Sequence, residues 1–268
     1  MHRQLPWLMM LPNNKEEEGE DPDTRVFFNL SQQKIHTIPL PEMHGKRCCG
    51  SFHNGWLMFV DLKLDICLFH PWSRKKIHLP PQSTFKKPNF VNDDNEVDEV
   101  DDYTYTMEEI RDNEILKAAQ SDDGNMVVVL YGLGHLGFCR IGEDDSYTDV
   151  ESDSLMEDVR YHKGHFYALS QRGSLYLLYI EDSFHPHAEK LTIDLDTDDD
   201  PLPYVFVALL VPDIVTDTMF VISRDGYGHK TIHFDIFRVS LEEGADEKKL
   251  KKFTKIESLG DRGTVFGA

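Results

Sequence analysis

Short apolar stretches rich in β-branched and aromatic residues alternate with polar turns along most of the chain. Four units repeat one order: an apolar stretch, a turn containing Gly or Asp, and a second apolar stretch. Segments of this kind, joined by such turns, are typical of β-hairpins. The pattern therefore predicts hairpins at residues 55–70, 125–142, 164–181 and 217–240.

Further strands flank these hairpins. An apolar stretch precedes each one, at residues 47–52, 115–119, 159–162 and 204–212, and short amphipathic stretches follow, for example at 76–80 and 190–195. Three more apolar stretches near the N-terminus, at residues 6–12, 24–30 and 34–40, add a further partial unit. The chain thus contains repeated units of three or four strands.

The spacing of the units suggests how they assemble. Once an acidic insertion at 92–114 is set aside, the spacing from one hairpin to the next is close to the ~40–50 residues of one propeller blade. We predict an all-β fold over residues 1–268: a single domain with a β-propeller-like array of about five four-stranded blades, either closed or incomplete. A β-sandwich is the alternative, which the repeat disfavours. Helical periodicity occurs only at 107–119, where a short helix is possible.

The charge is concentrated in a few segments. The chain has 48 Asp and Glu against 28 Lys and Arg, a formal net charge of −20. Four runs hold 30 of the 48 acids, at residues 15–23, 92–114, 142–158 and 194–200. Because closely spaced like charges repel, we predict that these runs are loops or mobile insertions.

The charge and the hydropathy exclude several classes of function. A strongly acidic protein repels nucleic-acid phosphates and anionic membranes, so we expect neither as a partner. No apolar run approaches the ~20 residues that span a bilayer, and the N-terminus lacks the features of a signal peptide. We expect an intracellular, soluble protein of the cytoplasm or nucleus.

Several motifs resemble cofactor or metal sites without meeting their requirements. Residues 132–137 read Gly-x-Gly-x-x-Gly, but a strand follows where a dinucleotide site needs a helix, so we predict a hairpin turn. Residues 194–205 begin like a calcium-binding loop but lack its central Gly and final Glu. The paired histidines at 162/165 and 185/187 offer two metal ligands each, too few for a site. We predict no catalytic residue, no cofactor and no metal.

The remaining residues that we single out have structural roles. In an intracellular chain without Cys-x-x-Cys spacing, we expect Cys48, Cys49, Cys67 and Cys139 to be buried thiols. Large apolar anchors near strand ends are predicted at Trp7, Trp56 and Trp72. Turn positions where φ is positive are predicted at Gly55, Gly164 and Gly173.

An ordered series of short motifs resembles one protein family. The motifs are Pro-Trp-Leu-Met at 6–9, Phe-Phe-Asn-Leu at 27–30 and Ile-Pro-Leu-Pro-Glu at 38–42, and further ones follow at 49–51, 54–57, 68–71, 77–81, 161–169 and 258–261. Their order resembles the plant family with the KIB-type β-propeller domain, whose members are often F-box proteins. The resemblance implies a propeller that binds the substrate of a ubiquitin ligase.

Two departures from the family change what the resemblance implies. Five residues precede Pro6, which leaves no room for an F-box, so we expect no ligase scaffold among the partners. Seven residues follow Asp261, so either the ring closes with fewer blades or the chain is a truncated relative. We expect a non-catalytic protein-interaction module whose protein partner is unknown; the insertion at 92–114 would favour a basic one. The alternatives are a degenerate family member with little function and, with less support, a propeller enzyme.

Overall fold

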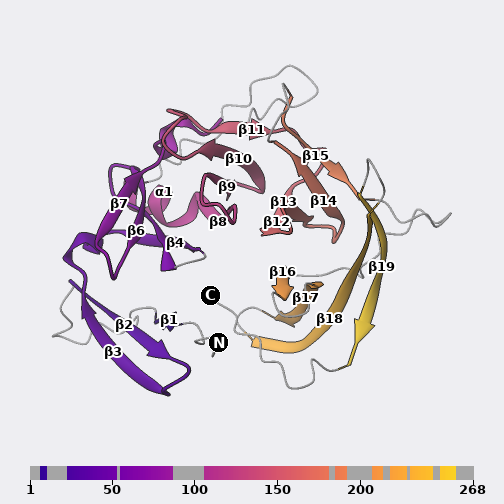
Figure 1. Ribbon diagram of the computed structural model, residues 1–268, viewed down its shortest axis with the longest axis horizontal. Helices are drawn as coiled ribbons and strands as arrows, with labels where there is room; N and C mark the ends of the chain where they lie inside the picture. The colour runs from indigo at the N-terminus through magenta and orange to yellow at the C-terminus, as the bar shows by residue number, and fades with distance from the viewer. Residues whose placement is uncertain are drawn as a thin grey trace.

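The chain folds into five antiparallel β-sheets arranged as the blades of a ring (Figure 1). This computed structural model describes residues 7–10, 23–52, 55–86, 106–180, 185–191, 207–213, 218–227, 230–243 and 248–257. Within those ranges four sheets have four strands each and the first has three. The prediction of an all-β propeller is confirmed.

The strands follow one another in chain order within each blade. Blade 1 consists of β1 (Trp7–Met9), β2 (Thr24–Asn29) and β3 (Lys34–Pro39). Blade 2 consists of β4 (Arg47–Ser51), β5 (Leu57–Val60), β6 (Ile66–His70) and β7 (Lys75–His78), and blade 3 of β8 (Ile115–Gln120), β9 (Met126–Tyr131), β10 (His135–Arg140) and β11 (Thr148–Val150). Blade 4 consists of β12 (Met156–His162), β13 (His165–Ser170), β14 (Leu175–Tyr179) and β15 (His187–Lys190), and blade 5 of β16 (Val207–Asp213), β17 (Thr218–Tyr227), β18 (Lys230–Glu243) and β19 (Lys248–Ile256).

Each predicted hairpin forms the middle of a blade. The hairpins expected at 55–70, 125–142, 164–181 and 217–240 are β5–β6, β9–β10, β13–β14 and β17–β18. The preceding apolar stretches supply β4, β8, β12 and β16, which lie nearest the centre of the ring in Figure 1. Consecutive members of this inner set contact one another.

Among the described residues the core consists of four apolar layers, one between each pair of consecutive blades. Side chains of a strand alternate between its two faces, so each middle strand contributes to two layers. In β9, Val127 and Val129 pack toward blade 2, whereas Val128 and Leu130 pack toward blade 4. All six residues of β9 are buried for this reason.

Blade 1 repeats the last three strands of blade 2. The β2–β3 and β6–β7 turns both have four residues, and both end in a residue with positive φ, Gln33 at 53° and Arg74 at 57°. In each turn the backbone N–H two residues before the next strand is bound by a side chain: Gln32 N–H donates to Asn29 Oδ1 and Ser73 N–H to His70 Nδ1, both at 3.1 Å. β1, β2 and β3 are therefore equivalent to β5, β6 and β7.

The structure corrects two predictions about the acidic runs. Residues 142–158 are not all loop, because they contain β11 and the first residues of β12. The helix expected at 107–119 is α1 (Met107–Asn113) alone, and residues 115–120 form β8. The described residues also include two short 3-10 helices, η1 (Pro41–Met43) and η3 (Gln82–Thr84). Residues 15–22, 92–105 and 194–200, including the calcium-like loop, lie outside the described residues.

The layer between blades 2 and 3 allows a direct test of the packing. Leu68 on β6 is fully buried in it, whereas Leu62 in the β5–β6 turn is exposed. We expect Leu68→Ala to lower the free energy of unfolding by about 2–5 kcal/mol, because it removes buried methyl groups and leaves a cavity. Leu62→Ala, the matched control, should change it by less than about 0.5 kcal/mol. Urea denaturation followed by circular dichroism measures both, and equal effects would contradict the assigned layer.

Candidate functional site

A fully buried carboxylate, Asp158 on β12, lies among the inner strands of blades 3, 4 and 5. Its Oδ2 accepts a hydrogen bond from the Leu210 N–H of β16 at 2.7 Å, and its Oδ1 accepts one from the Val159 N–H at 2.9 Å. Two cations approach Oδ1: the Lys117 ammonium of β8 at 3.4 Å and the Arg160 guanidinium at 3.5 Å. A single carboxylate thus joins three blades.

Two arginines extend this network of inner-strand contacts. Arg160 Nε donates to the Leu210 carbonyl oxygen at 3.1 Å, which adds a second bond between blades 4 and 5. Arg47 on β4 donates through Nη1 to the carbonyl oxygens of Ile115 at 2.9 Å and Arg111 at 3.2 Å, which ties blade 2 to blade 3. Polar contacts therefore connect the inner strands of blades 2 to 5.

Burial dominates the electrostatics of this cluster. It lowers the pKa of the Lys117 ammonium, an effect that the neighbouring Asp158 partly offsets. It also raises the pKa of the adjacent Glu157. Both oxygens of Asp158 already accept backbone N–H groups, so the arrangement is suited to clamping strands together.

Sequence reasoning did not identify these residues. Lys117 and Arg160 each interrupt an apolar strand. A charged residue in such a position indicates a buried ion pair, because charged side chains are rarely buried without a partner. The local sequence instead predicts that Asp158 belongs to an acidic loop. Its contact with Leu210 cannot be predicted from neighbouring residues, because Leu210 lies 52 positions away in the chain.

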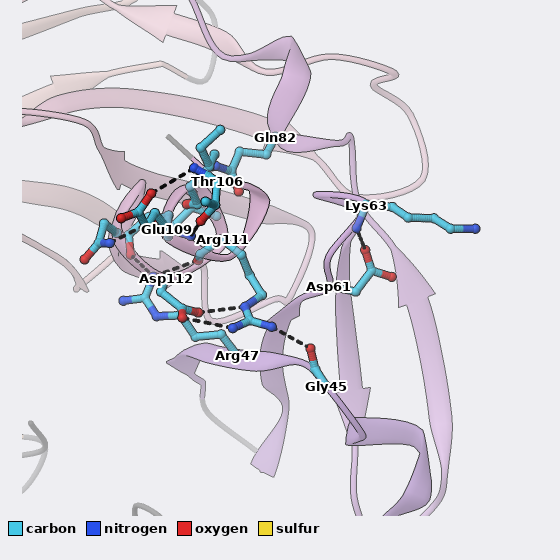
Figure 2. Close-up of polar contacts among 12 residues, drawn as sticks. Gly45, Arg47, Asp61, Lys63, Gln82, Thr106, Glu109, Arg111 and Asp112 are labelled. Carbon is cyan, nitrogen blue, oxygen red and sulfur yellow. Dashed lines mark hydrogen bonds and ion pairs between the residues drawn. The ribbon is translucent and has the colours of Figure 1, made fainter. Parts of the chain in front are cut away.

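Helix α1 packs where blades 2 and 3 meet (Figure 2). It begins with a capping box. The Thr106 hydroxyl accepts a hydrogen bond from the Glu109 N–H, and the Glu109 carboxylate accepts one from the Thr106 N–H. Arg111 pairs with Asp112 and donates to the Gly45 carbonyl oxygen at 3.0 Å, while Gln82 Nε2 donates to the Ile110 carbonyl oxygen at 3.4 Å. The basic residue of this helix thus holds the end of the acidic insertion against the ring.

The structure brings two of the three singled-out tryptophans together. The rings of Trp7 and Trp72 meet edge to face with centroids 5.0 Å apart, and Trp7 also stacks on His36 at 4.6 Å. Trp72 lies in the β6–β7 turn and is 57% exposed. Trp7 is half-buried and belongs to the edge of the layer between blades 1 and 2. The pair therefore forms an apolar surface at the boundary of these blades.

The other singled-out residues occupy turns. Trp56 packs edge to face against His70 at 5.4 Å. Gly55, Gly164 and Gly173 have φ of +82°, +80° and +82°. At Gly55 a Cβ atom would lie 3.5 Å from His70 Nε2, so there the positive φ, and not a lack of space, is what favours glycine.

The described residues of blades 1 and 2 carry a net positive charge, opposite to that of the whole chain. The described residues 23–52 and 55–86 hold nine Lys and Arg against four Asp and Glu. Lys34 pairs across the sheet with Asn29, which pairs with Trp7, so all three share the face toward blade 2. Lys76 pairs with Phe69 and so shares the face toward blade 1. We call Trp7, Lys34, His36, Trp72 and Lys76 the aromatic–lysine surface.

The glycine-rich motif and the paired histidines lie in ordinary turns and strands. The glycine-rich motif is the β9–β10 turn, as predicted, and at Gly134 a Cβ would lie 2.7 Å from the Met156 carbonyl oxygen. A hollow of about 180 Å³ beside it is lined by residues 134–136, 150 and 152–155. That volume is below the ~300–1,000 Å³ of typical ligand pockets. Among the described residues no three His, Cys, Asp or Glu side chains are grouped as metal ligands, and no helix is long and apolar enough to cross a membrane.

All four cysteines are free thiols, two of them buried and two half-buried. Burial raises the pKa of Cys48 to about 11 and of Cys139 to about 12. It also raises the pKa of the adjacent Cys49. Thiols with a raised pKa hold little thiolate near neutral pH and are poor nucleophiles.

The Asp158 clamp predicts a large and non-additive effect on stability. Asp158→Ala should lower the free energy of unfolding by about 3–5 kcal/mol, because it leaves the buried Lys117 ammonium without its counter-charge. Adding Lys117→Met should recover part of that loss, so the double variant should lose less than the sum of the single ones. Urea denaturation measures the cycle. If Asp158→Ala costs no more than Asp122→Ala in an exposed turn, the clamp is not the contact described here.

The raised thiol pKa predicts slow modification of Cys48. At pH 8 the folded protein should react with iodoacetamide at Cys48 roughly a hundredfold more slowly than the urea-unfolded chain, because a pKa near 11 leaves little thiolate. Mass spectrometry of timed samples gives the rate at this site. Equal rates in the folded and unfolded chain would contradict the prediction.

Known proteins match the chain in sequence over a short segment and in structure at low identity. The chain is 30% identical over 79 residues to "Putative F-box protein At4g22660" of Arabidopsis thaliana, a match that covers 29% of this chain and 20% of that protein. The structure of YCF48 bound to D1 peptide matches 85% of this chain and 60% of its own, with a TM-score of 0.44 and 11% identity. The propeller domain of Cps50 (Swd1) from Myceliophteria thermophila matches 87% and 66%, with a TM-score of 0.47 and 10% identity. At these scores the two structures carry no argument about function.

A family model matches most of the chain. The KIB1-4 β-propeller model matches residues 27–268, which include nearly all of the described strands from β2 onward. The five-bladed ring agrees with the fold named in that family. This chain therefore belongs to the KIB1-4 β-propeller family.

Proposed function

We propose that this protein is a non-catalytic protein-interaction module and that the aromatic–lysine surface is part of its binding site. The observation that carries the proposal is Trp72, a large aromatic side chain that is 57% exposed yet held on a short turn of a sheet. Tryptophan is enriched among the residues that dominate protein–protein binding.

The surroundings of Trp72 keep it in place. Its ring meets Trp7, which stacks on His36. Arg74 of the same turn donates to the Pro39 carbonyl oxygen at the end of β3 and to the Glu42 carboxylate of η1, both at 2.7 Å. A side chain fixed before binding loses less conformational entropy when a partner docks. This favours recognition by a rigid surface.

Two further facts agree with the proposal. The charged cluster around Asp158, on the inner strands, holds blades 3, 4 and 5 together. Family membership and the partial match to an F-box protein suggest a domain that binds other proteins. In an F-box protein the propeller would be the part that recognises a protein substrate.

Affinity purification with mass spectrometry tests the proposal. The wild-type chain, Trp72→Ala and the control Leu133→Ala are each expressed in plant cells with one tag; Leu133 is similarly exposed but lies in the β9–β10 turn. We expect a set of proteins that wild type and Leu133→Ala retain alike and that Trp72→Ala retains at least about tenfold less.

Two outcomes would contradict the proposal. If the three chains, shown by circular dichroism to be folded, retain the same proteins, Trp72 is not in the binding site. If folded wild type retains nothing above an untagged control, the chain is not an interaction module under these conditions.

A further inference from the structure

We infer that the aromatic–lysine surface recognises an acidic, extended segment of a partner protein that carries an aromatic or aliphatic side chain. This inference deepens the proposed function and rests on it, since it names the chemistry of the partner at the same surface. It also reverses the expectation, drawn from the acidic insertion at 92–114, of a basic partner.

The first argument is charge complementarity. The chain as a whole carries −20, yet blades 1 and 2 have nine basic against four acidic residues within the described ranges. Of those acids, Glu42 is bound by Arg74 and Asp23 by His44. Asp61 and Asp65 lie in the β5–β6 turn, at the opposite end of β6 from Trp72. The neighbourhood of Trp72 is therefore basic.

The second argument is the arrangement of the two lysines. Lys34 lies on the face of blade 1 toward blade 2, in one cross-strand row with Asn29 and Trp7. Lys76 lies on the face of blade 2 toward blade 1, opposite Phe69. Both side chains are exposed, so one lysine lies on each of the two blade faces whose boundary holds Trp7 and Trp72. An apolar anchor flanked by cations fits a segment with an apolar side chain between carboxylates.

The third argument concerns the acidic runs of the chain itself. The run at 15–23 follows the end of β1, whereas Trp7 is the first residue of that strand. The insertion at 92–114 follows the end of β7, whereas the Trp72 turn precedes its start. Each run is attached to the end of its strand that lies away from Trp72, so we assign the surface to a partner.

The range of electrostatic forces favours a protein segment over a polynucleotide. Charges separated by more than about 8 Å are largely screened at physiological salt, so a short acidic segment responds to the local lysines. A nucleic acid extends beyond the surface and meets the net negative charge of the rest of the protein.

Selection from a random peptide library tests the inference. The full chain is immobilised and panned with displayed random twelve-residue peptides at moderate salt. We expect the selected sequences to be enriched in Asp and Glu around an aromatic or aliphatic residue. One selected peptide is then labelled, and fluorescence anisotropy gives its affinity for each variant.

The variants are chosen to separate anchor from charge. Trp72→Ala should weaken binding at least about tenfold, and Trp72→Phe should recover most of that loss. Lys76→Glu should weaken it about three- to tenfold and reduce its dependence on salt. Lys63→Glu, the same charge change in the exposed β5–β6 turn, should leave the affinity within about twofold.

Other outcomes overturn the inference and remain distinct from failure of the proposed function. Selected peptides that are basic or uncharged, yet still need Trp72, would refute the acidic chemistry and leave the interaction surface standing. Acidic peptides whose affinity is the same for Trp72→Ala and wild type would place their site elsewhere. If a single-stranded DNA displaces the labelled peptide as well as the unlabelled peptide does, the surface binds polyanions in general. If the chain forms concentration-dependent dimers that Lys76→Glu disrupts, the occupant is a second copy of this chain.

Discussion

The middle blades of this protein are apolar on both faces, and the rest of the structure depends on covering these faces. A single sheet of three or four strands with two apolar faces cannot stand alone in water, since each face needs a neighbour. Alternation along β9 shows the consequence, because Val127 and Val128 enter different layers. Arranging the sheets around a centre gives each middle blade a neighbour on either side.

The inner strands combine this packing with buried charge. Apolar layers alone would allow neighbouring blades to slide, since the hydrophobic effect is not directional. The hydrogen bond from the Leu210 N–H to Asp158 does have direction, and it fixes β16 against β12. A buried ion pair adds little net stability because of its desolvation cost. Its role here is to define the relative position of blades 3, 4 and 5.

The same architecture separates the surface into chemically different regions. Turns on a rigid sheet are the positions where side chains can be exposed without weakening the core. In this chain one such turn displays Trp72, and the flanking strands display lysines, while the acids are concentrated in runs elsewhere in the sequence. A net charge of −20 therefore describes the chain but not the surface that we assign to binding.

The sequence by itself predicted the all-β class, the central hairpins and about five blades, because period-two alternation and turn residues are local properties. The acidic runs were a less reliable guide to loops. Residues 148–150 lie in such a run but form β11, because the adjacent β10 supplies the backbone hydrogen-bond partners. The contacts of Asp158 with Lys117 and Leu210, and the meeting of Trp7 with Trp72, were decided by the tertiary structure alone. These pairs are far apart in the chain, and only the stacking of blades around a common centre brings them together.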